Sequence, residues 1–99
     1  MKVIHIKDAP KNYQMDQQYV FIGRPSKWGN PYHMKRDGSN RDEVCDKYRD
    51  YLLDRPDLLL ALHELKDGKT LICYCKTTPE VRCHGDEIVR VMQERGLLE

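Results

Sequence analysis

The stretch KTLICYC, residues 69–75, decides the fold class. It is apolar at nearly every position, which is typical of a strand buried on both faces, so we expect it at the centre of a sheet. A loop, CKTTPEVRCHGDE (residues 75–87), leads from this strand toward a final helix. That helix should begin near Cys83, turn its apolar side chains inward and end at Gly96. A strand, a loop and a helix in this order indicate an α/β unit.

Two further strands are predicted closer to the N-terminus. VIHI (residues 3–6) and QYVFIGR (residues 18–24) are rich in β-branched and aromatic residues, which favour strands. The segment between them has the composition of a loop. Two helices should follow, one from an N-cap at Ser39 or Asn40 to about Leu53 and one from Pro56 to Gly68.

This order of elements predicts one domain over residues 1–99. Strands separated by helices favour a small three-layer α/β sandwich with a short, largely parallel sheet. Tyr48 lies on the inner face of the first long helix with Val44 and Leu52. We expect it to pack beneath the loop of residues 24–31, with its hydroxyl hydrogen-bonded. Cys45 falls on the same apolar face and should belong to the core.

Composition restricts the function only weakly. The 99 residues carry 17 Lys and Arg against 16 Asp and Glu, so no bulk charge attracts nucleic acid or a membrane surface. The N-terminus lacks the apolar region of a signal peptide, and no apolar run approaches the roughly 20 residues that span a bilayer. We therefore expect a cytoplasmic protein without a membrane partner. Its four cysteines should then be free thiols, metal ligands or a reactive thiolate.

The loop GRPSKWGNP (residues 23–31) is the first candidate for a binding site. Ligands of α/β sheets usually bind at the carboxyl ends of the strands, where this loop and residues 75–87 should both lie. Arg24 and Lys27 could contact an anion, and Trp28 could stack on a planar ring. Alternatively, Trp28 closes the end of a small core. The predicted ligand contacts are Arg24, Ser26, Lys27, Trp28, Gly29, Asn30, Cys75 and Gly85.

The cysteines of the second segment leave several interpretations open. Cys73 and Cys75 alternate to one face of a strand, and Cys83 and His84 follow at the start of a helix. A strand should hold the sulfurs of a C-x-C pair apart, so we prefer to read Cys73 and Cys75 as small buried hydrophobes and assign no metal. On this reading a chelator should leave the melting temperature unchanged. A zinc site formed by Cys73, Cys75, Cys83 and His84 is the alternative.

Cys83 differs because it lies at a helix N-terminus, where the helix dipole stabilises a thiolate or a bound anion. The catalytic candidates are Cys83, His84 and Asp86, although Asp86 could instead cap the helix. Gly85 would let a ligand approach the backbone closely. An anion is expected where this helix meets the first loop, with Arg24 and Arg82 as its charged contacts.

The motifs resemble a known family. YVFIGRPSKWGNP, then R-x-E-V-x-x-K-Y-R-x-Y-L, then LICYC and CHGDEI are similar to the signatures of a small bacterial and phage domain, domain of unknown function 4326. The resemblance covers residues 19–92 and implies a Rossmann-like α/β fold, without a settled activity. The signature positions that it implies are Gly23, Arg24, Trp28, Gly29, Asn30, Pro31, Tyr48, Cys73, Cys75, Cys83, His84, Gly85 and Asp86.

Together these features favour a nucleotide- or nucleobase-binding α/β protein, with its pocket between the first loop and the final helix. It could act as an enzyme on nucleotides or nucleic acid. The expected partner is a small anionic or nucleotide ligand, with nucleic acid as a further candidate. The alternatives are a zinc-stabilised interaction module and a thiol redox protein that uses Cys75 and Cys83.

Overall fold

A three-stranded parallel sheet forms the base of the protein. The computed structural model describes residues 1–66, 68–76, 78 and 80–98. The strands are β1 (Lys2–His5), β2 (Tyr19–Phe21) and β3 (Thr70–Cys73), in the order β1-β3-β2. Both neighbours of β3 run parallel to it, so the predicted central position of this strand is confirmed.

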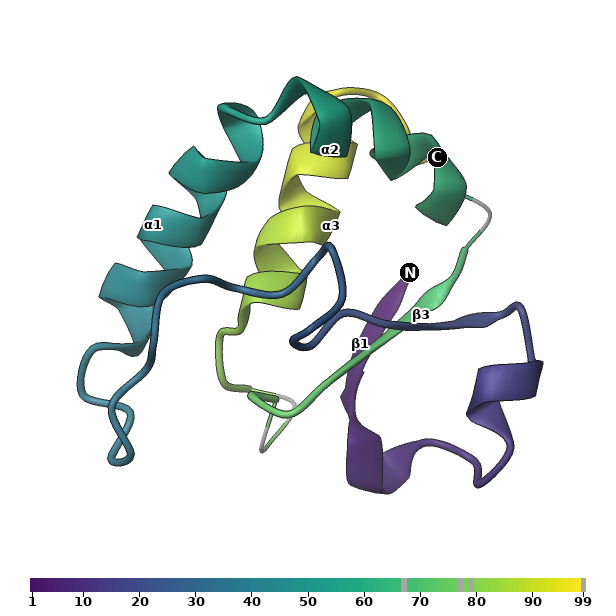
Figure 1. The fold of residues 1–99 in the computed structure, drawn as a ribbon, viewed down its shortest axis with the longest axis horizontal. Coiled ribbons are helices and arrows are strands. Elements are labelled where there is room, and N and C mark those ends of the chain that lie inside the picture. Colours follow the sequence, from purple (N-terminus) through teal and green to yellow (C-terminus); the bar gives the residue numbers. More distant parts are fainter. Residues whose placement is uncertain (67, 77, 79, 99) are drawn as a thin grey trace.

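The helices lie together on one side of this sheet (Figure 1). They are α1 (Arg41–Leu53), α2 (Pro56–Ala61) and α3 (His84–Glu94), and a 3-10 helix (Leu62–Leu65) continues α2. Asn40 is the N-cap residue of α1 and Cys83 that of α3, close to the predicted starts. The second helix loses its α-helical geometry earlier than predicted, and residue 67 of the predicted span lies outside the described residues.

The two faces of the sheet have different coverings. Leu71 and Cys73 belong to the core cluster that the helices cover, whereas Ile72, between them, points to the opposite face and is also fully buried. The β1–β2 connection passes β3 in one direction, and the β2–β3 connection returns in the other. The β1–β2 connection, residues 6–18, contains two 3-10 turns rather than α-helices.

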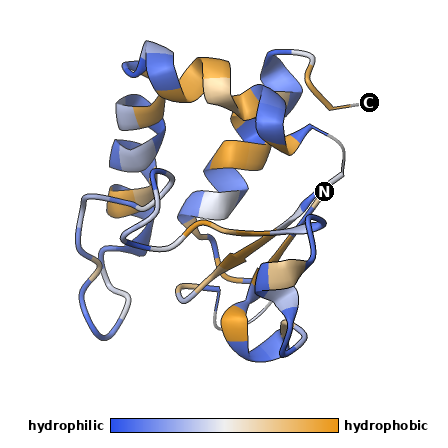
Figure 2. Ribbon diagram, turned by 45° about the vertical axis from the view of Figure 1, so that its right-hand side comes forward, coloured by the Kyte–Doolittle hydropathy of each residue, from blue (hydrophilic) through white to orange (hydrophobic). Residues whose placement is uncertain are grey.

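The fold is thus the small α/β architecture that the sequence predicted. In Figure 2 hydrophobic colours mark the strands and much of α2 and α3, while the connection from β2 to α1 is mostly hydrophilic. None of the helices in the described part of the chain is both long and apolar enough to cross a bilayer.

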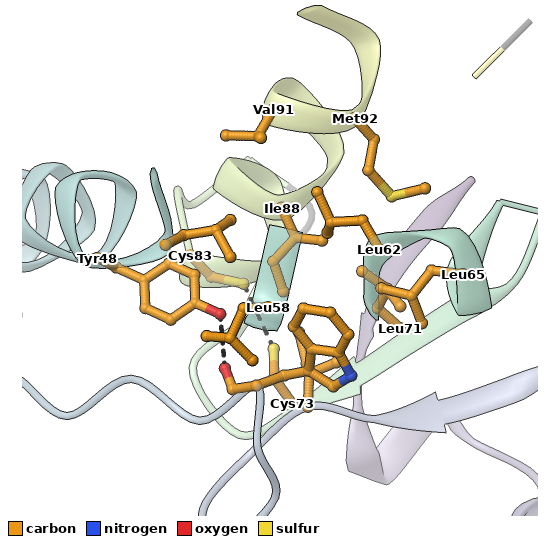
Figure 3. Packing of buried hydrophobic residues seen from close by; sticks show 13 residues of the cluster. Tyr48, Leu58, Leu62, Leu65, Leu71, Cys73, Cys83, Ile88, Val91 and Met92 are labelled. Carbon is orange, nitrogen blue, oxygen red and sulfur yellow. Dashed lines mark hydrogen bonds between the residues drawn. The ribbon is translucent and has the colours of Figure 1, made fainter. Parts of the chain in front are cut away.

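The first loop is anchored to the core by Tyr48 and Trp28. The fully buried Tyr48 donates its hydroxyl hydrogen to the carbonyl oxygen of Trp28 at 2.7 Å, as the dashed line from Tyr48 in Figure 3 marks. The predicted packing of Tyr48 is confirmed. The Trp28 ring is only 2% exposed and belongs to the core cluster. Closing the core, rather than stacking on a ligand, is therefore its role in this structure, because neither face of the ring is accessible.

Candidate functional site

An open pocket of about 260 Å³ lies beyond the carboxyl ends of β2 and β3. Its walls come from the first loop, the start of α1 and the N-terminus of α3, so the two segments singled out in the sequence do meet here. Of the predicted site residues it brings together Arg24, Asn30, Cys75, Cys83 and His84.

Other residues predicted for the ligand lie elsewhere. Ser26, Lys27 and Gly29 line a second, more open hollow beside α2. Lys27 forms an ion pair with Glu64 there, with Nζ 2.9 Å from the carboxylate. Arg24 and Lys27 of the first loop therefore lie in different hollows. Of these two, Arg24 lines the pocket between the first loop and the segment of residues 75–87.

Gly85 is required for packing rather than for ligand approach. A Cβ atom at this position would lie 2.7 Å from Cγ1 of Val3 and 2.8 Å from Cδ1 of Ile22, both side-chain atoms of the strand layer. The first turn of α3 can lie this close to the sheet only because residue 85 has no side chain. A close approach to the backbone at Gly85 does occur, but the approaching atoms are core side chains of the protein and not a ligand.

The sulfur atoms of three cysteines form a cluster at the base of the pocket. The Sγ atoms of Cys73 and Cys83 are 3.4 Å apart (Figure 3), and that of Cys75 is 3.6 Å from that of Cys73. All three lie within 4.8 Å of one another. The expectation that a C-x-C pair holds its sulfurs apart is wrong here, because β3 ends at Cys73 and the chain bends before Cys75. Cys45, buried on α1, lies outside the cluster.

His84 presents one ring nitrogen to this cluster. Its Nε2 lies 2.8 Å from the carbonyl oxygen of Ile22, and since a carbonyl can only accept, Nε2 carries the hydrogen. Nδ1 is then a lone-pair acceptor, 3.3 Å from the Sγ atom of Cys75. The ring is 5% exposed and packs edge-on against Tyr48, which holds it in this orientation.

Hydrogen bonds between the sulfurs concentrate negative charge on one of them. Thiol donation from Cys75 and Cys83, helped by the backbone N–H groups of Cys75 and Lys76, lowers the pKa of Cys73. Sharing hydrogen bonds with Cys73 raises the pKa of Cys75 and also that of Cys83, and burial adds to both increases. Cys73 is thus the sulfur best prepared to be a thiolate, which is the form that binds metals.

The N-terminus of α3 is capped by groups of the protein itself. Asp86 accepts from the backbone N–H of Cys83 at 2.9 Å and forms an ion pair with Lys76 at 2.7 Å. The N–H of Gly85 points to the Sγ atom of Cys83. Asp86 therefore has the capping role that the sequence left open. The anion predicted at this helix end would compete with these internal acceptors.

Charged side chains hold the loop between Cys75 and Cys83. Arg82 pairs with the buried Glu87 at 3.0 Å and with Asp46 at 2.7 Å. Arg41 donates through Nη1 to the carbonyl oxygens of Cys75 and Arg82, at 2.9 Å each. Arg41 was not predicted as a site residue, because its partners are backbone atoms more than thirty positions away along the chain. The signals in the sequence were its place at the start of α1, next to the N-cap, and its position as the first residue of the motif R-x-E-V-x-x-K-Y-R-x-Y-L.

Comparison with known proteins identifies the family. The model of the family described as Domain of unknown function (DUF4326) matches residues 4–94. No curated protein and no solved structure matches the chain. Since the match spans nearly the whole chain and includes both segments that build the pocket, the protein belongs to the family of domain of unknown function 4326.

Proposed function

We propose that this protein binds one metal ion of the zinc class through Cys73, Cys75 and Cys83, and that the ion forms the floor of a ligand pocket. The observation that carries the proposal is the cluster of three sulfurs within 4.8 Å of one another. Zinc–sulfur bonds of about 2.3 Å in a tetrahedron place the sulfurs about 3.8 Å apart. The separations of 3.4 and 3.6 Å need only a small expansion to reach this value.

His84 is the best candidate for a fourth ligand. Metal-binding histidines usually donate their second N–H to a carbonyl or a carboxylate, which fixes the ring and leaves the other nitrogen free to bind. The bond from Nε2 to Ile22 has this form, and Nδ1 faces Cys75. The ligand atoms that lie within 4.8 Å of one another are those of the three cysteines, so Nδ1 would have to move closer to Cys73 and Cys83 to complete a Cys3His set, which is a common structural zinc site.

This proposal replaces the metal-free thiols that we preferred from the sequence. The zinc-stabilised interaction module would use the same ligands. A thiol redox function, which the sequence suggested for Cys75 and Cys83, would also use sulfurs of this cluster. The pair at 3.4 Å is Cys73 and Cys83, whose Sγ atoms would have to approach to about 2.0 Å and lose two electrons to an oxidant to form a disulfide. Such a bond would remove two metal ligands, so the two functions exclude each other in one molecule. The nucleotide ligand stays a prediction, and the pocket beside the sulfurs is where it would bind.

A cobalt titration tests the metal site. Reduced, chelator-washed protein should bind one equivalent of Co²⁺ and develop the visible bands of tetrahedral thiolate coordination, and Zn²⁺ should displace it. Replacing Cys73, Cys75 or Cys83 singly by Ser should abolish these bands. Cys45→Ala is the matched control, because this cysteine is buried like Cys73 and Cys83 but lies outside the cluster, and its spectrum should match the parent's. Absence of thiolate bands in the parent protein would refute the proposal.

A further inference from the structure

The described lining of the pocket has a marked excess of positive charge. Three arginines, Arg24, Arg41 and Arg82, contribute to it, and none of its described lining residues is acidic. The whole chain balances 17 basic residues against 16 acidic ones. The excess is therefore a local property of the pocket and does not follow from composition.

Two of the three arginines keep their charge available. Arg82 is neutralised by Glu87 and Asp46, whereas Arg24 and Arg41 have no carboxylate within 4.0 Å among the residues that the structure describes. Within the described ranges, the side chain of Arg24 hydrogen-bonds to the ring of His33, at 2.9 Å. The partly buried Arg41 donates from Nη1 to two carbonyl oxygens, which use the two hydrogens of that nitrogen and do not cancel the charge of the guanidinium. A partly buried cation without a counter-charge favours binding of an anion.

Two tyrosine rings stand at the rim of the same pocket. Tyr32 is 40% exposed and Tyr74 61% exposed, and both line the cavity. Tyr74 is held in place by edge-to-face contacts with Phe21 and His5, at centroid distances of 5.7 and 6.3 Å. Exposed rings fixed in this way provide stacking surfaces for a planar group. Tyr74 offers the accessible aromatic face that the buried Trp28 lacks, whereas the ring of Tyr32 has Nζ of Lys47 over it at 5.6 Å.

We propose that the pocket binds a small phosphate monoester that carries a planar ring, of the size of a nucleoside monophosphate. Arg24 and Arg41 would bind the phosphate, since a guanidinium offers paired donors to its oxygens. Tyr74 would contact the ring. The volume of about 260 Å³ lies just below the range of about 300–1,000 Å³ that holds drug-sized ligands, which favours a mononucleotide over a dinucleotide. The proposal goes beyond the metal site and does not depend on it.

Isothermal titration calorimetry on the full chain tests the proposal. The probes are adenosine, guanosine, cytidine and uridine monophosphates, inorganic phosphate, and the uncharged nucleosides. At least one monophosphate should bind at least tenfold more tightly than inorganic phosphate and than its own nucleoside. Failure of every monophosphate to bind overturns the proposal. Equal binding of a nucleoside overturns its anionic part, and equal binding of inorganic phosphate overturns the part played by the ring.

Variants of the first loop locate the site. Arg24→Ala should weaken the monophosphate at least tenfold. Lys27→Ala is the matched control, because it removes a cation three positions away that pairs with Glu64 outside this pocket. Tyr74→Leu should weaken the monophosphate and leave inorganic phosphate unaffected. Equal affinities of the Arg24→Ala and Lys27→Ala proteins would overturn the assignment.

The same titrations with and without one equivalent of Co²⁺ separate the two proposals. Binding of the monophosphate by protein that shows no thiolate bands would refute the metal site and support the anion pocket. Normal Co²⁺ bands in a protein that binds none of the monophosphates would support the metal site and refute the anion pocket. The bands of the Arg24→Ala protein should match those of the parent, since the hydrogen bonds of Arg24 in the described part of the chain go to His33 and not to a cysteine.

Discussion

Arg41 and Cys75 are joined by a hydrogen bond of 2.9 Å from a guanidinium nitrogen to a backbone carbonyl oxygen. The same nitrogen also donates to the carbonyl of Arg82, so one side chain of α1 holds both ends of the loop between the second and third cysteines. The spacing of the sulfurs thus depends on a helix that contributes no sulfur to the cluster.

Replacing Arg41 by Ala should loosen the cysteine loop. Hydrogen bonds from a charged donor contribute about 1.5 to 3 kcal/mol each, and changes around metal ligands typically cost tenfold or more in metal affinity. We expect at least a tenfold weaker affinity for Co²⁺, measured by competition with a chelator. Lys47→Ala, on the exposed side of the same helix, should have no such effect. An unchanged affinity in the Arg41→Ala protein would show that the loop holds its shape without this contact.

Removal of metal should lower the thermal stability of the parent protein. An ion that binds the folded chain adds about 2.7 kcal/mol when its free concentration is 100 times its dissociation constant. Calorimetry of the reduced protein with one equivalent of Zn²⁺ should therefore show a drop in melting temperature after a chelator is added. The Cys73→Ser protein should melt at the same temperature with and without chelator. The same result for the parent would favour the metal-free thiols expected from the sequence.

Tyr48→Phe should destabilise the protein by about 1 to 3 kcal/mol, because it leaves the carbonyl of Trp28 without its donor in a buried position. The loss can be measured by denaturant unfolding. Tyr51→Phe is the control on the same helix, since its hydroxyl bonds to the exposed Arg55 and should contribute little. A loss no larger than that of the control would mean that the first loop is anchored by other contacts.

Gly85→Ala should destabilise the fold although alanine is the better helix former. The gain in helix propensity is at most about 1 kcal/mol, whereas overpacking a core costs typically 1 to 3 kcal/mol. The new Cβ would meet Val3 at 2.7 Å, so Val3→Ala in the same chain should recover part of the loss. A double-mutant cycle of unfolding free energies measures this coupling. Strict additivity of the two substitutions would contradict the proposed clash.

The thiol of Cys45 should make stability fall at alkaline pH. Burial raises the pKa of Cys45 from 9.0 to about 11 in the folded chain. Between these values the unfolded thiol loses its proton and the folded one keeps it, so stability decreases as pH rises from 9 to 11. The full effect is about 2 to 3 kcal/mol. The difference in unfolding free energy between the parent and Cys45→Ala should change by this amount over that range. A difference independent of pH would place the thiol in a more polar environment.

Local patterns in the sequence determined the elements and their order. The apolar run within residues 69–75 identified the central strand, observed at Thr70–Cys73, because burial on both faces of a strand removes most polar residues from it. Helical spacing around Tyr48 located the inner face of α1, and Cys83 marked the start of α3. Since loops after parallel strands meet at one edge of a sheet, the position of the pocket also followed from the sequence.

The tertiary structure alone decided which side chains reach that pocket. Arg24 and Lys27 belong to one loop, yet Lys27 turns to Glu64, thirty-seven positions away. The grouping of the three sulfurs depends on the residue at which β3 ends, and spacing in the sequence does not contain that information. Side-chain direction in an irregular segment is set by long-range contacts such as those of Arg41 with Cys75 and Arg82, whereas a periodic pattern specifies direction only within a helix or a strand.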